Sequence, residues 1–195
     1  MNKVELQGAS GDAMDLAVGR RIRELRRARD LPLTAVAERT GLSIGFLSQV
    51  ERGLSSPSLR VLTNLADVFG VALGALFGGA EGEPDPVVVR AAERPELKLW
   101  RSGISKQLLT PAAPDSRLNL YLVRMEPEAS TGDEFYTHQG EEAGLVLEGA
   151  MILTVDTDQY RLERGDSFRF ASTRPHRFSN PLPRPTLVVW INSLA

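Results

Sequence analysis

The stretch TAVAERTGLSIGFLSQVERG, residues 34–53, places apolar side chains at helical spacing on both sides of a glycine-containing turn. Val36 lies in the first run, and Leu47 and Val50 lie in the second. Each run therefore predicts a short helix with one apolar face. The turn between the runs is too short for anything but a sharp corner, and Gly41 supplies the backbone freedom that such a corner needs. We expect two helices that pack against each other across this turn.

Helical spacing of apolar residues continues on both sides of this pair, over residues 16–77. Short breaks within this region carry the residues that stop and start helices. Ser43 is expected to cap the third helix, and Ser56 with Pro57 to open the fourth. Residues 1–15 are expected to form a flexible tail. The N-terminal part of the chain is thus predicted to be all-α.

The small residue Ala37, the turn glycine Gly41 and the sequence ERG at residues 51–53 together resemble the helix-turn-helix of the lambda-repressor-like (XRE) regulators. The resemblance covers residues 16–77 and implies a five-helix DNA-binding domain. It also implies that the helix from Ile44 to Arg52 enters the major groove of DNA.

The same resemblance identifies the residues that face the DNA. Gln49 can pair with adenine, and Ile44 can meet a thymine methyl group. One such domain covers only half a site, so a homodimer on a palindromic operator is expected, with its recognition helices about 34 Å apart. Phosphate contacts are expected from Ser43, Arg52 and the amides at Ser58, and base contacts from Ile44, Gly45, Ser48 and Gln49.

Arginine is concentrated in the first helix, but the charge excess of this half is small. Residues 1–78 carry ten Lys and Arg against eight Asp and Glu. Most of these arginines are expected to solvate an outer face. Because the net charge of this half is small, nonspecific attraction to DNA should be modest and strongly salt-dependent. The resemblance gives Arg26 a separate role, because this position in the family pairs with the glutamate of the third helix, here Glu51. We expect an ion pair that joins the first helix to the third.

The pattern changes to short β-rich runs after a linker. The linker, GGAEGEPDP at residues 78–86, contains Gly, Pro and acidic residues that suit an extended connection. From residue 87 to 195, runs such as VVV, LKLW, ISKQLL, LNLYLVRM, MILTVD and TLVVWIN are separated by turn residues. This spacing predicts an all-β barrel or sandwich. The chain is therefore expected to be α+β, as two domains.

Residues 132–180 carry two motifs that resemble those of the cupins, whose fold is a double-stranded β-helix barrel. In the first motif His138, Glu142 and Gly149 have the required spacing, and Tyr136 stands where the family has a first histidine. In the second motif the matching residues are Gly165, His176 and Asn180, whereas Ala171 and Thr173 replace a proline and a glycine. Both histidines of the chain thus occupy motif positions.

Three interpretations of this cluster stay open. His138, Glu142 and His176 could hold a divalent metal ion. The substitution at Tyr136 weakens that interpretation, because a neutral phenol is a poor ligand for such an ion. The residues could instead form a satisfied polar network, or bind an organic effector. An effector pocket is favoured, formed by Tyr136, His138, Glu142, His176 and Glu134, with an amine, polyamine or amino acid as its ligand and no cofactor expected.

Composition excludes several other classes of protein. The chain has 195 residues, a net charge of −2 and no cysteine, which excludes disulfides and thiol nucleophiles. No apolar run approaches the ~18 residues that cross a bilayer, and the N-terminus lacks the apolar core of a signal peptide, so a cytoplasmic protein is expected. The two resemblances together predict a transcriptional regulator, more often a repressor, whose cupin barrel senses a small molecule. The alternative is a metal-dependent cupin enzyme fused to a DNA-binding domain.

Overall fold

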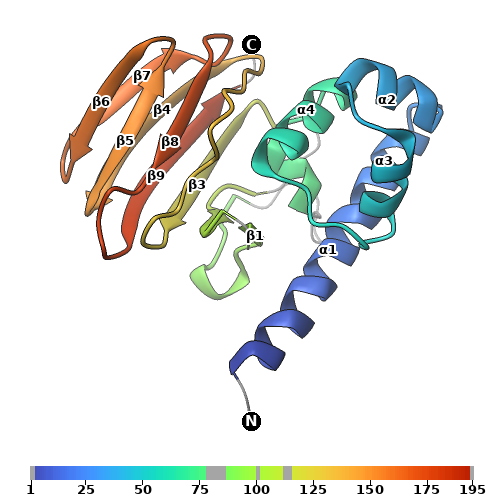
Figure 1. Ribbon diagram of the computed structural model, residues 1–195, viewed down its shortest axis with the longest axis horizontal. Helices are drawn as coiled ribbons and strands as arrows, with labels where there is room; N and C mark the ends of the chain where they lie inside the picture. The colour runs from blue at the N-terminus through green and yellow to red at the C-terminus, as the bar shows by residue number, and fades with distance from the viewer. Residues whose placement is uncertain (1–2, 78–86, 100–101, 112–115, 194–195) are drawn as a thin grey trace.

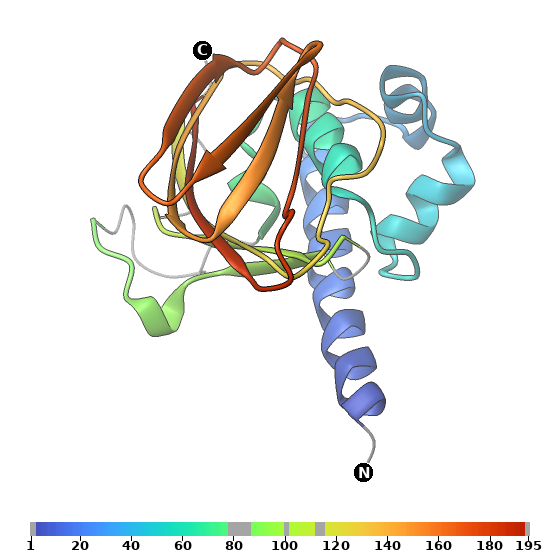
Figure 2. The same ribbon diagram turned by 60° about the vertical axis from the view of Figure 1, so that its left-hand side comes forward.

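A computed structural model describes residues 3–77, 87–99, 102–111 and 116–193, and the expected linker lies outside these ranges (Figure 1). A helical part and a β-rich part lie side by side (Figure 2). The helical part contains α1 (Lys3–Arg27), α2 (Leu33–Thr40), α3 (Ile44–Glu51), α4 (Leu59–Phe69) and the 3-10 helix η1 (Leu73–Phe77). None of the described helices is both long and apolar enough to cross a membrane.

The expectation of five α-helices is wrong for this described region, which has four. The segment expected to be the fifth helix is the 3-10 helix η1. Gly70, whose φ is 63°, ends α4. Only a few residues then remain before the end of the helical part. So short a segment gains too few backbone hydrogen bonds to nucleate an α-helix.

The first helix begins earlier than the sequence predicted. Residues 3–15 belong to α1 rather than to a flexible tail. The C-terminal end of this segment has tertiary contacts, because the Ser56 hydroxyl donates to the Asp15 carboxylate and the backbone N–H of Lys98 lies 3.1 Å from the Met14 sulfur. Contacts with both halves of the molecule therefore stabilise α1 where the sequence gave no strong helical pattern.

The corner between α2 and α3 has the expected geometry. Leu47 and Val50 are each only 1% exposed, and Gly41 ends α2 with a φ of 69°. Ser43 caps α3 by accepting a hydrogen bond of 3.1 Å from the backbone N–H of Phe46. At the next helix the prediction was wrong by two residues, since Ser58 rather than Ser56 caps α4, and Ser56 contacts α1 instead.

An ion pair joins α1 to α3, as the sequence predicted. Arg26 Nε lies 2.5 Å from Glu51 Oε1, and Arg26 Nη2 lies 3.0 Å from Glu51 Oε2. A third bond runs from Arg26 Nη1 to the carbonyl of Leu31, 2.9 Å away. Gly19 allows the same two helices to approach, because a Cβ at this position would lie 2.2 Å from the carbonyl oxygen of Val50.

The β-rich part consists of two antiparallel sheets. The larger sheet has the order β1-β2-β3-β9-β4-β7 and the smaller has the order β6-β5-β8. β6 and β7 follow each other in the chain, but the turn at Gly165, with a φ of 93°, leads them into different sheets. The described ladders therefore do not close into the expected barrel. The strands are β1 (Glu96–Leu99), β2 (Ile104–Leu108), β3 (Leu118–Met125), β4 (Glu141–Glu148), β5 (Ala150–Val155), β6 (Asp158–Glu163), β7 (Ser167–Ala171), β8 (His176–Ser179) and β9 (Thr186–Ser193).

The run VVV at residues 87–89 is not a strand, contrary to the prediction. Val87 is 91% exposed and Val88 is 57% exposed, and neither pairs with a described strand. A short 3-10 helix, η2 (Ala91–Glu93), follows them before β1 begins. An apolar segment does not form a strand unless a neighbouring strand is available to pair with it.

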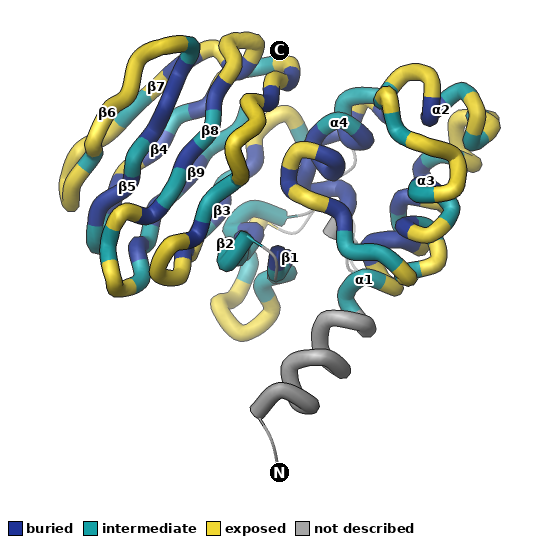
Figure 3. The backbone as a smooth tube through the Cα atoms, viewed as in Figure 1, coloured by how far each residue is buried: buried dark blue, intermediate teal, exposed yellow. Residues whose placement is uncertain are grey.

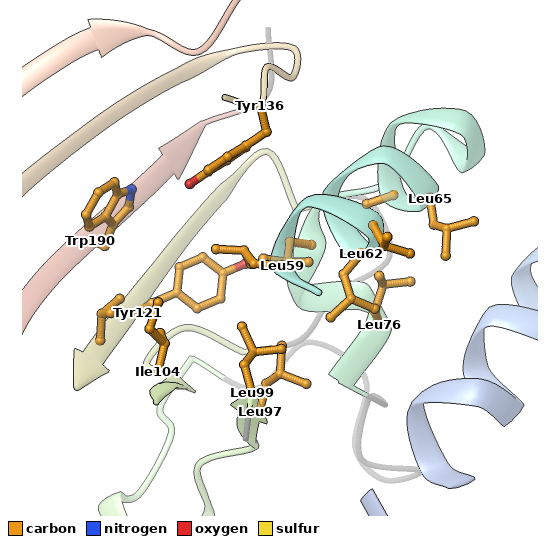
Figure 4. Packing of buried hydrophobic residues seen from close by; sticks show 14 of the residues in the cluster. Leu59, Leu62, Leu65, Leu76, Leu97, Leu99, Ile104, Tyr121, Tyr136 and Trp190 are labelled. Atoms are coloured by element: carbon orange, nitrogen blue, oxygen red, sulfur yellow. The ribbon is translucent and has the colours of Figure 1, made fainter. Parts of the chain in front are cut away.

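Buried side chains of the two parts form one continuous cluster. Figure 3 marks the buried residues along the backbone of both parts. Leu59 and Leu62 of α4 lie close to Leu97 and Leu99 of β1 and to Tyr121 of β3 (Figure 4). The helical part is therefore packed directly on the β-rich part, with α4 as the helix that faces it.

Breaking the link between α1 and α3 is expected to destabilise the fold. The Arg26 side chain is 13% exposed and that of Glu51 is 7% exposed, so Arg26→Ala leaves a nearly buried carboxylate without its partner. We expect the free energy of unfolding to fall by about 3 kcal/mol in urea denaturation. Arg20→Ala is the matched control, because the Arg20 side chain is 80% exposed and should change stability by less than about 0.5 kcal/mol. Unchanged stability with weakened DNA binding would instead make Arg26 a DNA contact.

Candidate functional site

The exposed face of α3 carries the residues that the sequence predicted to face DNA. Ile44 is 47% exposed, and Gly45 and Gln49 are also exposed. Ser48 is half-buried, and Ser43 is engaged as the cap of the helix. The remaining two residues, Arg52 and Ser58, are exposed at the ends of α3 and α4. The helix thus presents one buried and one open face, with Leu47 and Val50 on the buried one.

A second cluster of predicted residues lies in the β-rich part. Glu142 is 2% exposed on β4, His176 is 0% exposed on β8, and His138 is 8% exposed in the loop before β4. Their ligand atoms all lie within 4.8 Å of one another. Tyr136 joins them, because its ring centroid is 4.2 Å from that of His176 and their backbones pair in a short bridge. The structure therefore brings together four of the five residues predicted for the effector pocket.

Hydrogen bonds fix the two imidazole rings. His138 Nδ1 lies 3.0 Å from the carbonyl of Gln139, and His176 Nδ1 lies 2.8 Å from the carbonyl of Arg174. A carbonyl only accepts, so this network places a proton on each Nδ1 and directs each Nε2 toward Glu142. Outer contacts of this kind are what orient histidines in metal and ligand sites.

The pKa values of the two imidazoles are shifted in opposite directions. His138 Nε2 lies 3.0 Å from Glu142 Oε1, and although burial lowers the pKa of His138, the hydrogen bond and charge of Glu142 raise it above its ordinary value. Burial lowers the pKa of His176, which favours its neutral form. His176 Nε2 and Glu142 Oε2 then face each other as two acceptors, 3.3 Å apart, and neither has a hydrogen-bond partner among the described residues. A hydrogen-bond donor or a cation would complete this pair.

Sequence reasoning missed a residue of this site. Lys106 on β2 is 2% exposed and lines the same cavity as Glu142. Burial lowers the pKa of Lys106 to about 8, and the charge of Glu142 opposes that shift. The signal was present in the run ISKQL, because strict alternation puts Lys106 on the same face as the buried residues Ile104 and Leu108. Asn192 was also missed, and its Nδ2 donates to Glu142 Oε1 at 2.9 Å.

The cavity at this cluster lies between the two parts of the molecule. Its volume is about 20 Å³, which is room for roughly one water molecule. Figure 4 shows Tyr121 and Tyr136 on the sheet side and Leu59 on the side of α4. One wall comes from α4 and the segment after it, namely Leu59, Thr63, Ala66, Asp67, Val71, Ala72 and Leu73, and the other comes from Lys106, Tyr136, His138, Gln139, Glu142, Asn192 and Ser193.

Comparison with known proteins assigns both parts to families. Residues 17–77 match the family described as "Helix-turn-helix domain", and residues 121–192 match the family described as "Cupin domain". The chain is 33% identical over 165 residues to the HTH-type transcriptional regulator PuuR of Escherichia coli (strain K12), which covers 85% of this chain and 88% of PuuR. The chain belongs to this family of HTH-type transcriptional regulators.

More distant relatives agree with this family. The HTH-type transcriptional regulator SutR of Escherichia coli (strain K12) is 24% identical over 159 residues, covering 82% of this chain and 84% of SutR. The crystal structure of an HTH_3 family transcriptional regulator from Vibrio cholerae superposes with a TM-score of 0.76 at 24% identity, covering 95% of this chain and 99% of that one. The likeness to the Vibrio protein shows that the helix-turn-helix and β-rich arrangement is shared.

Three glutamates close in the sequence, Glu134, Glu141 and Glu142, point in different directions. Glu134 does not line the cavity, because its Oε2 lies 2.5 Å from Nη1 of Arg60 on α4. Glu141 is exposed and pairs with Arg169 on the surface of the larger sheet. Adjacent residues of β4 alternate between faces, so only Glu142 points inward. Acidic character at the cavity is therefore limited to Glu142 and to Asp67 of α4.

The β4 glutamates allow a matched test of buried charge. Glu142→Gln leaves Lys106 and His138 without their nearest carboxylate, so we expect the free energy of unfolding to fall by about 3 kcal/mol in urea denaturation at neutral pH. Glu141→Gln is the control, because this exposed side chain should change stability by less than about 0.5 kcal/mol. Equal effects of the two substitutions would contradict the described charge network.

Proposed function

We propose that this regulator binds a palindromic operator as a homodimer in the cytoplasm and responds to a small-molecule effector bound in its cupin domain. One observation carries the proposal: the cavity at Glu142 has a helix of the DNA-binding part as its outer wall. An effector in this cavity would contact α4 directly. Family membership supports the regulatory role, and repression is the direction that we expect.

At the DNA, each residue on the open face of α3 has a proposed role. Gln49 would form a bidentate pair with adenine, and Ile44 would contact a thymine methyl group. Gly45 and Ser48 lie between them on the same side of the helix, where the backbone can approach the base edges. Phosphates would be bound by Ser43, Arg52 and the backbone amides at Ser58.

The coupling between effector and DNA would run through α4. Its first turn is joined to the loop before β4 by Arg60 and Glu134, 2.5 Å apart. Nearer its C-terminal end, the half-buried Asp67 carboxylate accepts a hydrogen bond from the backbone N–H of Gln139 and lies near His138. The loop that carries Tyr136 and His138 is therefore attached to α4 at two points. A ligand that favours one position of this loop also favours one position of α4, which shifts the population of DNA-binding conformations.

A metal-dependent function is the second candidate, and the donor types at the site fit a divalent ion. His138, Glu142 and His176 would hold it, and the unpartnered atoms Glu142 Oε2 and His176 Nε2 are suitable ligands. Such an ion would act as a Lewis acid toward an oxygen atom of a bound molecule. Two features oppose tight binding: burial raises the pKa of Tyr136 and keeps it neutral, and the Lys106 ammonium repels a second cation.

DNA recognition can be tested without knowledge of the operator. Selection from a random duplex library should recover an inverted repeat, because a symmetric dimer presents two recognition helices. Gln49→Ala should relax one adenine position in each half-site, with roughly a tenfold loss of discrimination there. Gln159→Ala, on the exposed strand β6, is the matched control and should leave the selected sequence unchanged. A selected sequence that is identical for wild type and Gln49→Ala would remove Gln49 from base recognition.

Native mass spectrometry of protein purified without chelator separates the two candidate functions. Because Tyr136 and Lys106 oppose a divalent ion, we expect a dimer that carries no stoichiometric metal, either empty or with a bound organic molecule. The variant His176→Ala is measured in parallel, to test whether any metal or organic molecule retained by the wild type is bound at this cluster. Stoichiometric metal in the wild type that is lost in His176→Ala would contradict the expectation and favour metal-dependent chemistry.

A further inference from the structure

Lys106 is a charged side chain inside the effector cavity whose role the two motifs do not explain. Its Nζ lies 5.5 Å from the ring centroid of Tyr121 and 5.7 Å from that of Trp190, so aromatic faces surround it on the inner side. No carboxylate of the described residues lies within ion-pair distance of this ammonium, although Glu142 is close enough to affect it electrostatically. A buried ammonium that lines a cavity and lacks a bonded anion is suited to receive one.

The carboxylate of Glu142 lines the same cavity and supplies hydrogen-bond acceptors. Its Oε1 already accepts from His138 and Asn192, at 3.0 and 2.9 Å. Its Oε2 and the Nε2 of His176 are left without donors. The lining of the cavity therefore includes an ammonium, on Lys106, and a carboxylate oxygen of Glu142 that lacks a donor and lies 3.3 Å from the equally unpartnered Nε2 of His176.

We propose that Lys106 is the anion-binding residue of the effector pocket, and that the effector is a small zwitterion with its carboxylate on Lys106 and its amino group at Glu142 and His176. This inference rests on the proposed function, and it narrows the amine, polyamine or amino acid that the sequence suggested. A diamine would place a second ammonium against Lys106, whereas an amino acid satisfies both Lys106 and Glu142. Glu134, which the sequence placed in the effector pocket, contacts Arg60 and does not line the cavity.

The size of the cavity limits the ligand and connects it to α4. At about 20 Å³ the closed cavity admits little more than a water molecule, so an amino acid enters only if α4 and the loop before β4 move apart. Small ligands need the smallest displacement. The shortest amino acids with separated charged groups are therefore the first probes to use.

The test is isothermal titration calorimetry with β-alanine, its amide and diaminopropane, extended to longer ω-amino acids with the corresponding amides and diamines. We expect the amino acids to bind the wild type more tightly than the matched amides and diamines. Lys106→Met should weaken amino-acid binding by about tenfold or more and change amide binding by less than about threefold, because only the carboxylate uses the ammonium. Lys98→Met is the matched control, since Lys98 on β1 does not line this cavity and its side chain is 39% exposed.

Three results would overturn the proposal: a diamine that binds as tightly as the amino acid of equal length, amino-acid affinity that survives in Lys106→Met, or no binding by any amino acid of the series. If Lys106→Met fails to fold, Lys106→Gln replaces it, because glutamine removes the positive charge but retains a polar group, and the same loss of amino-acid binding is expected. Operator binding is measured in parallel. Amino-acid binding that depends on Lys106 but leaves operator affinity unchanged would refute the proposed regulation while supporting the assignment of Lys106.

Discussion

The buried negative charge of Glu142 is the constraint on which the β-rich part is organised. A carboxylate that is 2% exposed stays ionised only where neighbouring groups replace water. Burial raises the pKa of Glu142, but its bond to His138 and the charges of His138, His176 and Lys106 lower it below its ordinary value. These partners come from the loop before β4, from β8 and from β2, and Asn192 on β9 adds a fourth segment. One charge thus determines how four segments of the chain meet.

The same cluster is the point at which the two parts of the molecule contact each other. One wall of its cavity is formed by α4, the helix that follows α3 in the chain. Arg60 and Asp67 contact the loop that carries two of the cluster's residues. Under the proposed function, an effector in the cavity would therefore act on α4 directly, next to the proposed DNA-binding helix α3. The covalent order alone would suggest that the two parts communicate through the linker. The contacts of Arg60 and Asp67 do not involve the linker.

Local rules predicted the helical part well. Ser43, Leu47 and Val50 have the cap and core positions that spacing assigned to them, and Arg26 pairs with Glu51. The resemblance to the two cupin motifs also predicted that His138, Glu142 and His176 lie together. These features depend on residues close in the chain or on a fixed pattern of strands.

Contacts between distant segments that the two family resemblances do not imply were not predicted. The α4 wall of the cavity exists only because the two parts are in contact, and no local pattern encodes that contact. Glu134 was misplaced for the same reason, since its partner Arg60 lies in the other half of the chain. Lys106 is a different case, because alternation in β2 indicated an inward lysine. A charged residue at a core position is the kind of local inconsistency that marks a functional site.

The most direct test uses the chain's two histidines, both of which belong to the buried cluster around Glu142. Histidine-selective isotope labelling gives ring NMR signals from this cluster alone. If effector binding and DNA binding are coupled, the coupling is reciprocal, and operator DNA must also act on the cavity. The account predicts that the signals of His138 and His176 shift when the selected operator is added but not with a scrambled duplex of equal length. Unshifted signals from protein that is fully bound to its operator would contradict it.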